Sequence, residues 1–288
     1  MRGAWDVPSW LPAGRLIVPD PRLNEGHFSS EPALWVSDDP LPDAGSLLAR
    51  LLMSQAEHWF WPLLLTGPYV PKRYLERLEQ PVSQEWMQSR AGRPWHAGDL
   101  APVPAEAVSD QDPDRVLAAW WREVVGGVPD EPLDLGEEDA LPEVPFRQWP
   151  GLAPASAAHG DPDCTAAEIA SSAVGVAELT GREEPPYLGL VPADDGAAAI
   201  AECGWLSRAG DTAETAAVIR SWQQRFGARL CLLGLDALAV TVAWPPQSAE
   251  QALLVAAEHL AFGKDLGTDF SSYASGLRTT RVWRFWWD

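Results

Sequence analysis

The chain has 288 residues, of which 46% are hydrophobic, and this is enough apolar material to bury the core of one large or two ordinary domains. The 41 acidic residues outnumber the 21 basic ones and give a formal net charge of −20, which repels nucleic acid phosphates and anionic lipid headgroups. The charge therefore argues against nucleic acid and membrane surfaces as partners. It attracts a basic protein partner, and a role in solubility is the alternative.

The N-terminal residues MRGAWDVPSWLPAG lack the apolar core of a secretory signal, and no stretch of the sequence reaches the length that spans a bilayer. These features predict a cytoplasmic protein. Its three cysteines, Cys164, Cys203 and Cys231, lie far apart without CxxC spacing, which indicates neither a disulfide framework nor a zinc site. We therefore expect no metal and no cofactor.

Short strands are predicted in the first 42 residues, where prolines separate the apolar stretches RLIVP and ALWVS. Leucines at three- and four-residue spacing then predict an amphipathic helix between Ala44 and Trp59. The stretch FWPLLLTG that follows predicts a buried strand. Because Pro62 cannot donate a ladder hydrogen bond, we expect this strand to lie at a sheet edge or to end early.

Two further helices are predicted before the C-terminal third. Asp112 followed by Pro113 is typical of an N-cap and first helical turn, and Thr165 with Glu168 has capping-box spacing. Between these helices, residues 130–143 hold seven acidic residues and no basic one. This composition predicts a solvated loop or interdomain connection, and an acidic surface that mimics another charged molecule is the alternative.

Helical and strand periodicities alternate clearly in the C-terminal third. Strands are predicted at YLGLVP, ARLCLLGLD, ALAVTVAWPP and RVWRFWWD, and helices at DDGAAAIAECGW, TAETAAVIRSWQQRFG, the segment capped by Ser248 and Gln251, and SSYASGL. The order strand, helices, two strands, helices, strand predicts an α+β fold with a ferredoxin-like βαββαβ antiparallel sheet and helices on one face.

These elements suggest a division of the chain into three parts. Residues 1–150 form an N-terminal α/β region of uncertain topology, residues 151–183 form a linker and helix, and residues 184–288 form the C-terminal α+β domain.

Successive side chains of the last predicted strand point to opposite faces of the sheet. One set is Trp283, Phe285 and Trp287, and the other set is Arg284, Trp286 and Asp288. Three aromatic rings in register bury the larger area, so we expect the first set to face the core. Trp286 then lies outside, where the N-terminal region covers it, a ligand stacks on it, or a protein partner contacts it.

No common catalytic signature occurs in the sequence, which lacks GxSxG, HExxH, P-loop, GxGxxG and CxxC motifs. The remaining weak catalytic candidates are Glu258 and His259, with Asp236 and Arg225 on neighbouring elements. Adjacent helical residues diverge by about 100°, so Glu258 and His259 cannot act on one atom unaided. His259 follows Val255 at helical spacing, which favours a half-buried structural histidine.

Several pieces in the C-terminal third resemble a known family. They are YLGLVPA, CGW, RSWQQRFGARL, the diproline Pro245-Pro246, AAEHLAF and the closing Phe285-Trp286-Trp287-Asp288. In this order they resemble domain-of-unknown-function family 4253, an uncharacterised bacterial family, over Tyr187 to Asp288. The segment WPGLAP extends the similarity upstream to Trp149, whereas AFGKDLGTD departs from the aromatic-Cys-Pro-Asp turn expected there. Membership implies a domain and no established activity.

Three functions are therefore open. The first is a binding protein, immunity-like or regulatory, that recognises a protein partner through its acidic surface and exposed aromatic residues. Its candidate partner-binding residues are Trp286, Arg284, Arg225, Asp236 and Asp288. The alternative is a small-molecule hydrolase or transferase that uses Glu258 and His259 in a pocket between domains, and the third is a purely structural subunit. Whether the protein is an enzyme, and its oligomeric state, stay open at this point.

Overall fold

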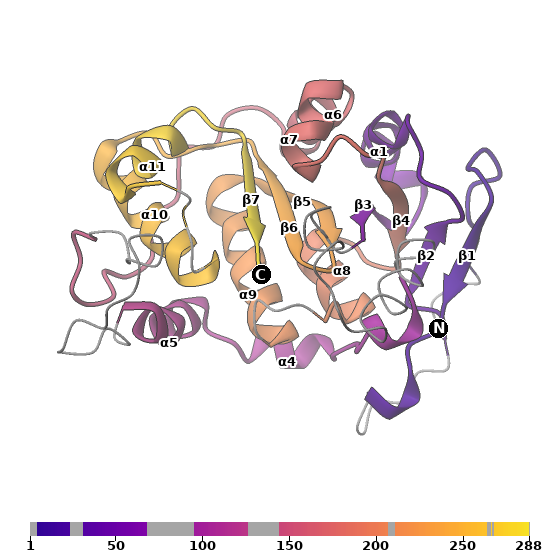
Figure 1. Cartoon of the computed structure of the whole chain (residues 1–288), viewed down its shortest axis with the longest axis horizontal. Coiled ribbons are helices and arrows are strands. Elements are labelled where there is room, and N and C mark those ends of the chain that lie inside the picture. Colours follow the sequence, from indigo (N-terminus) through magenta and orange to yellow (C-terminus); the bar gives the residue numbers. More distant parts are fainter. Residues whose placement is uncertain are drawn as a thin grey trace, which may run out of the picture.

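The computed structural model describes residues 5–23, 31–67, 95–125, 144–206, 211–263, 266 and 268–287. Within them one seven-stranded sheet runs across the whole molecule in the order β1-β2-β4-β3-β5-β6-β7 (Figure 1). The strands are β1 (Gly14–Ile17), β2 (Leu34–Ser37), β3 (Trp61–Thr66), β4 (Tyr187–Val191), β5 (Ala228–Gly234), β6 (Ala237–Val242) and β7 (Val282–Trp286). The acidic segment 130–143 lies outside the described residues.

Every neighbouring pair of strands is antiparallel except β3 and β5, which are parallel. The mixed α+β class is thus confirmed, with a mostly antiparallel sheet. The ferredoxin-like strand order is not confirmed, because β4 pairs with β2 and β3 instead of strands from its own part of the chain. The sheet is continuous across the boundary expected between residues 150 and 184.

The prediction that Pro62 places its strand at an edge is wrong, since β3 is fully buried between β4 and β5. Pairing of β3 with β5 begins only at Leu64, two residues after the proline. The indole N–H of Trp61 donates to the carbonyl oxygen of Leu230 on β5 at 2.9 Å. A side chain therefore satisfies a carbonyl at the place where the ladder lacks a proline N–H.

Helices cover both faces of the sheet, whereas one face was expected. They are α1 (Ala44–Met53), α4 (Ala105–Ser109), α5 (Pro113–Val125), α6 (Pro162–Ala170), α7 (Ala173–Thr180), α8 (Gly196–Cys203), α9 (Thr212–Phe226), α10 (Ala249–Gly263) and α11 (Phe270–Leu277). On β7, the Trp222 ring of α9 stacks on Phe285. The neighbouring residue Arg284 lies on the opposite face beside Gly181, the C-cap of α7. The two helices therefore pack on opposite sides of one strand.

Most predicted helix starts are confirmed by their side-chain caps. The carboxylate of Asp211 accepts from the N–H groups of Ala213 and Glu214 at the start of α9, and Pro113 opens α5. The capping box at Thr165 is wrong, because Asp161 caps α6 four residues earlier. Asp161 precedes a proline at N1, which supports an earlier start of the helix than the capping-box spacing indicated.

One continuous hydrophobic core joins the elements on both sides of the expected domain boundary. Trp283, Phe285 and Trp287 belong to this core, as expected, with exposed fractions of 1%, 4% and 6%, whereas Trp286 is 40% exposed. Among the described residues no helix is both long and apolar enough to cross a bilayer.

Candidate functional site

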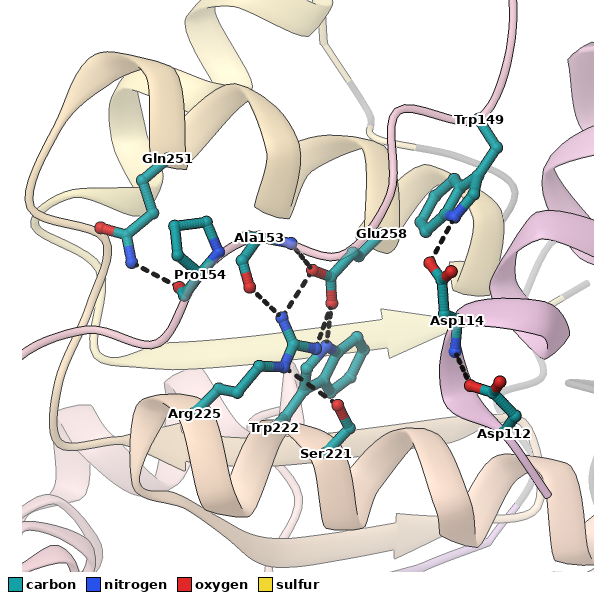
Figure 2. Close-up of polar contacts among 10 residues, drawn as sticks. All are labelled: Asp112, Asp114, Trp149, Ala153, Pro154, Ser221, Trp222, Arg225, Gln251 and Glu258. Atoms are coloured by element: carbon teal, nitrogen blue, oxygen red, sulfur yellow. Dashed lines mark hydrogen bonds and ion pairs between the residues drawn. The ribbon is translucent and has the colours of Figure 1, made fainter. Parts of the chain in front are cut away.

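The carboxylate of Glu258 on α10 is fully buried and lies against the last turns of α9. The guanidinium of Arg225 binds both of its oxygens, with Nη1 to Oε1 and Nη2 to Oε2 at 2.7 Å each. The indole N–H of Trp222 donates to Oε2, and the backbone N–H of Ala153 donates to Oε1, both at 2.8 Å (Figure 2). Each carboxylate oxygen thus accepts two hydrogen bonds.

The Ala153 contact ties an upstream segment to these helices. We name residues 149–156 the strap. Arg225 Nη1 donates to the Ala153 carbonyl at 2.9 Å, and the amide of Gln251 donates to the Pro154 carbonyl at 2.8 Å. At the start of the strap, the indole N–H of Trp149 donates to Asp114 at 2.8 Å (Figure 2). The strap is thus fixed between α5, α9 and α10.

This geometry gives Glu258 the environment of a structural carboxylate. A general acid or base needs to reach a substrate proton directly or through one water molecule. Both Glu258 oxygens are occupied by protein donors, and Glu258 and Arg225 line neither of the two clefts described below. The arrangement stabilises the contact of α9, α10 and the strap, because a buried charge requires paired and hydrogen-bonded partners.

His259 is also fully buried, whereas the sequence predicted a half-buried histidine. Its Nδ1 lies 3.0 Å from the hydroxyl of Tyr273 on α11, and its ring makes edge contacts with Trp222, Trp283 and Phe285. Burial in this aromatic shell, with the nearby Arg225 charge as a second cause, lowers the pKa of His259 to about 3. The imidazole is therefore neutral in the folded protein near neutral pH.

This pKa predicts a loss of stability on acidification. The unfolded chain takes up a proton at His259 below the ordinary pKa of 6.5, whereas the folded chain does so only near 3. Between these values protons favour the unfolded state, so the free energy of unfolding falls by about 2 kcal/mol from about pH 7 to about pH 5 through this residue. Urea denaturation at both pH values should show this loss in wild type and a smaller loss in His259→Gln. An equal loss in both proteins would contradict it, and His159→Gln, at an exposed position, is the matched control.

Three of the predicted partner-binding residues lie near one another where the start of β6 meets the end of β7. Asp236 precedes β6 and pairs with Arg182 at 3.0 Å. Ala237 is the register partner of Trp286, and Arg284 lies two residues away on the same face. Arg225 is separate from them, in the Glu258 network, and Asp288 lies outside the described residues.

Tryptophans of the N-terminal region, which was expected to cover Trp286, pack elsewhere. The Trp120 ring lies against Phe262, and the Trp121 ring lies against Trp149. Within the described part of the chain, Trp286 makes no ring contact. Of the three alternatives for Trp286, coverage by these residues therefore finds no support.

A cleft of about 440 Å³ lies between the end of α1, the start of α6 and the loop after β4. Its lining includes Met53, Trp59, Asp161, Asp163, Cys164 and Asp194, and it includes no lysine or arginine. The N–H groups of Cys164 and Asp163 donate to Asp161 and lower its pKa, so that this carboxylate stays ionised. The thiol of Cys164 is free and exposed. Sequence reasoning missed this cleft, because its residues come from three distant segments.

A second cleft has a volume of about 760 Å³. It is lined by His159, the diproline Pro245-Pro246, and the end of α11 with Arg278. Asp161, on the first cleft, and His159, on the second, belong to one turn. Asp161 caps α6 with its carboxylate.

Comparison with family models gives one match, over residues 187–288, to the family described as Domain of unknown function (DUF4253). The searches among curated proteins and among solved structures found no match. The matched segment begins with β4, so it includes Arg225 and Glu258 but neither β3 nor the strap. The match confirms the resemblance to this family over Tyr187 to Asp288.

Proposed function

We propose that the protein is a binding protein, of an immunity-like or regulatory kind, that recognises a basic segment of a protein partner. The observation that carries the proposal is the acidic cleft between α1 and α6, defined by Met53, Trp59, Asp161, Asp163, Cys164 and Asp194. Its three aspartates face solvent on a chain of net charge −20, and this combination attracts cations at long range.

The cleft combines charge with apolar surface. Met53 is 58% exposed at its rim, and Trp59 contributes an indole face. A lysine or arginine side chain gains from both, because its cationic head pairs with a carboxylate while its stem or guanidinium plane lies on the ring. Asp163 is already paired with Arg229, so Asp161 and Asp194 are the carboxylates assigned to the partner.

The alternative, a hydrolase or transferase using Glu258 and His259, has less support. Glu258 has its oxygens occupied by Arg225, Trp222 and Ala153, and His259 is enclosed by aromatic rings. Neither residue lines a described cleft. We propose a cytoplasmic location, a reducing compartment in which its three free cysteines stay unpaired.

The test is affinity capture from a related cell lysate at rising salt. Asp161→Asn/Asp194→Asn removes two charges from the cleft while asparagine keeps the helix cap, so capture of the partner should weaken about tenfold. Glu106→Gln/Asp110→Asn removes the same charge from exposed positions on α4 and at its C-cap and should retain capture. Absence of any captured protein at low salt, or equal capture by both double variants, would count against the proposal.

A further inference from the structure

Strand β7 forms one edge of the sheet and pairs only with β6 among the described residues. Trp287 N–H donates to the Asp236 carbonyl at 2.9 Å, and Val242 N–H donates to the Arg281 carbonyl at 2.8 Å. In an antiparallel ladder such bonded positions recur at every second residue. The backbone N–H and C=O groups of Arg284 and Trp286 therefore point away from β6, towards the open edge.

The side chains of the same two residues are exposed, with the guanidinium of Arg284 lying beside Gly181. Arg284 and Trp286 are exposed on the same face of the strand, and in the described part of the chain neither has an ion pair, a ring contact or a side-chain hydrogen bond. Natural edge strands are commonly protected by charges or by covering segments. On β7 the charge of Arg284 is the protection of this kind, and Trp286, which is 40% exposed, lies two residues further along the strand.

We propose that β7 pairs with β7 of a second copy of this chain, antiparallel and about a two-fold axis at Phe285. This register places Arg284 opposite Trp286 of the second copy, and Trp286 opposite its Arg284. The facing residues are those whose backbone groups point outward, so each facing pair exchanges two hydrogen bonds. The interface is isologous, as expected for a symmetric dimer.

The charge of Arg284 favours this register over the registers with a two-fold axis one residue away. A two-fold axis at Arg284 would set two guanidinium groups side by side, and like charges directly opposite each other are destabilising. A two-fold axis at Trp286 would leave each arginine without the facing indole. Only the axis at Phe285 brings each cation over an indole ring, where cation–π attraction favours the contact. This surface is distinct from the acidic cleft, so the inference does not depend on the proposed function.

Net charge opposes the association, because two chains of −20 repel each other. Added salt screens this repulsion. Sedimentation equilibrium should therefore show a dimer that strengthens as the salt concentration rises. Trp286→Ala or Arg284→Ala should weaken the dimer about tenfold, since each removes both cation–π pairs of the symmetric interface. Trp10→Ala, at a tryptophan of similar exposure beneath Arg50, should leave the dimer unchanged.

Cross-linking tests the register directly, in a background where the exposed Cys164 is replaced by serine. A mixture of Arg284→Cys and Trp286→Cys chains should form disulfide-linked pairs faster than either variant alone, because only unlike positions face each other. A single monomeric species at all salt and protein concentrations would overturn the proposal. Equal cross-linking in the mixture and in the separate variants would overturn the register and, with it, the proposed interface.

Discussion

Glu258→Gln is expected to lower the free energy of unfolding by about 3–5 kcal/mol, because it leaves the partly buried guanidinium of Arg225 without its counter-charge. The substitution keeps the shape of the side chain and removes the negative charge that holds Arg225, Trp222 and Ala153 together. Urea denaturation monitored by tryptophan fluorescence measures the change.

Glu250→Gln provides the matched control for this prediction. It makes the same chemical change on α10 at an exposed position in the first turn, where the expected cost is below about 1 kcal/mol. If the two variants lost the same stability, Glu258 would not have the structural role derived from its contacts. A folded Glu258→Gln protein of wild-type stability would reopen the enzymatic alternative.

Trp283→Ala should cost about 3–5 kcal/mol, the usual range for removing a fully buried tryptophan. The Trp283 ring contacts Trp222, Phe226 and His259, so its removal leaves a cavity where β7 meets α9 and α10. Denaturation of Trp283→Ala measures this loss. The cost should be larger than that of the neighbouring Trp286→Ala, which removes an exposed ring and should change monomer stability by about 0.5 kcal/mol or less.

The comparison of Trp283 with Trp286 tests which aromatic residues of β7 face the core. Should Trp283→Ala fail to fold, Trp283→Phe removes less volume and gives a measurable intermediate loss. Equal losses at positions 283 and 286, measured at a protein concentration where the chain is monomeric, would contradict the assignment of opposite faces. The measurement is independent of the proposed dimer.

Local signals in the sequence predicted most elements of this fold. The N-cap at Asp211 and the glycine at position 227, with φ of 59°, mark both ends of α9. The alternation of large aromatic residues in the last strand predicted which of them are buried, and the structure confirms it for Trp283 and Phe285. These features depend on residues close in sequence, so they can be predicted from local sequence patterns.

Strand order could not be predicted in this way. The parallel pairing of Leu64 with Leu232 joins residues far apart in the sequence, and the apolar pattern of β3 contains no information on its neighbours. Pro62 indicated an edge strand because proline has no backbone N–H for the ladder. In the structure the indole N–H of Trp61 donates to the facing strand instead, and a rule based on proline alone does not predict this contact.

The candidate site shows a similar division. The sequence indicated Glu258 as a weak catalytic candidate with Arg225 on a neighbouring element, and in the structure these two residues form an ion pair. The structural role of this pair also depends on Ala153, whose backbone N–H donates to Glu258 and whose carbonyl accepts from Arg225. Any residue has these backbone groups, so the sequence does not mark Ala153 as part of the site. The acidic cleft depends likewise on the approach of α6 to the end of α1, which no periodicity predicts.

The most direct test of the structural role of the Arg225 and Glu258 pair is a double-mutant cycle with Arg225→Met and Glu258→Leu. If the pair is a buried clamp, the double variant should be more stable than the sum of the single losses implies, by about 2 kcal/mol or more, since no uncompensated charge remains. Single losses that are small and add within about 0.5 kcal/mol would show that the two charges are not coupled, and would contradict the account.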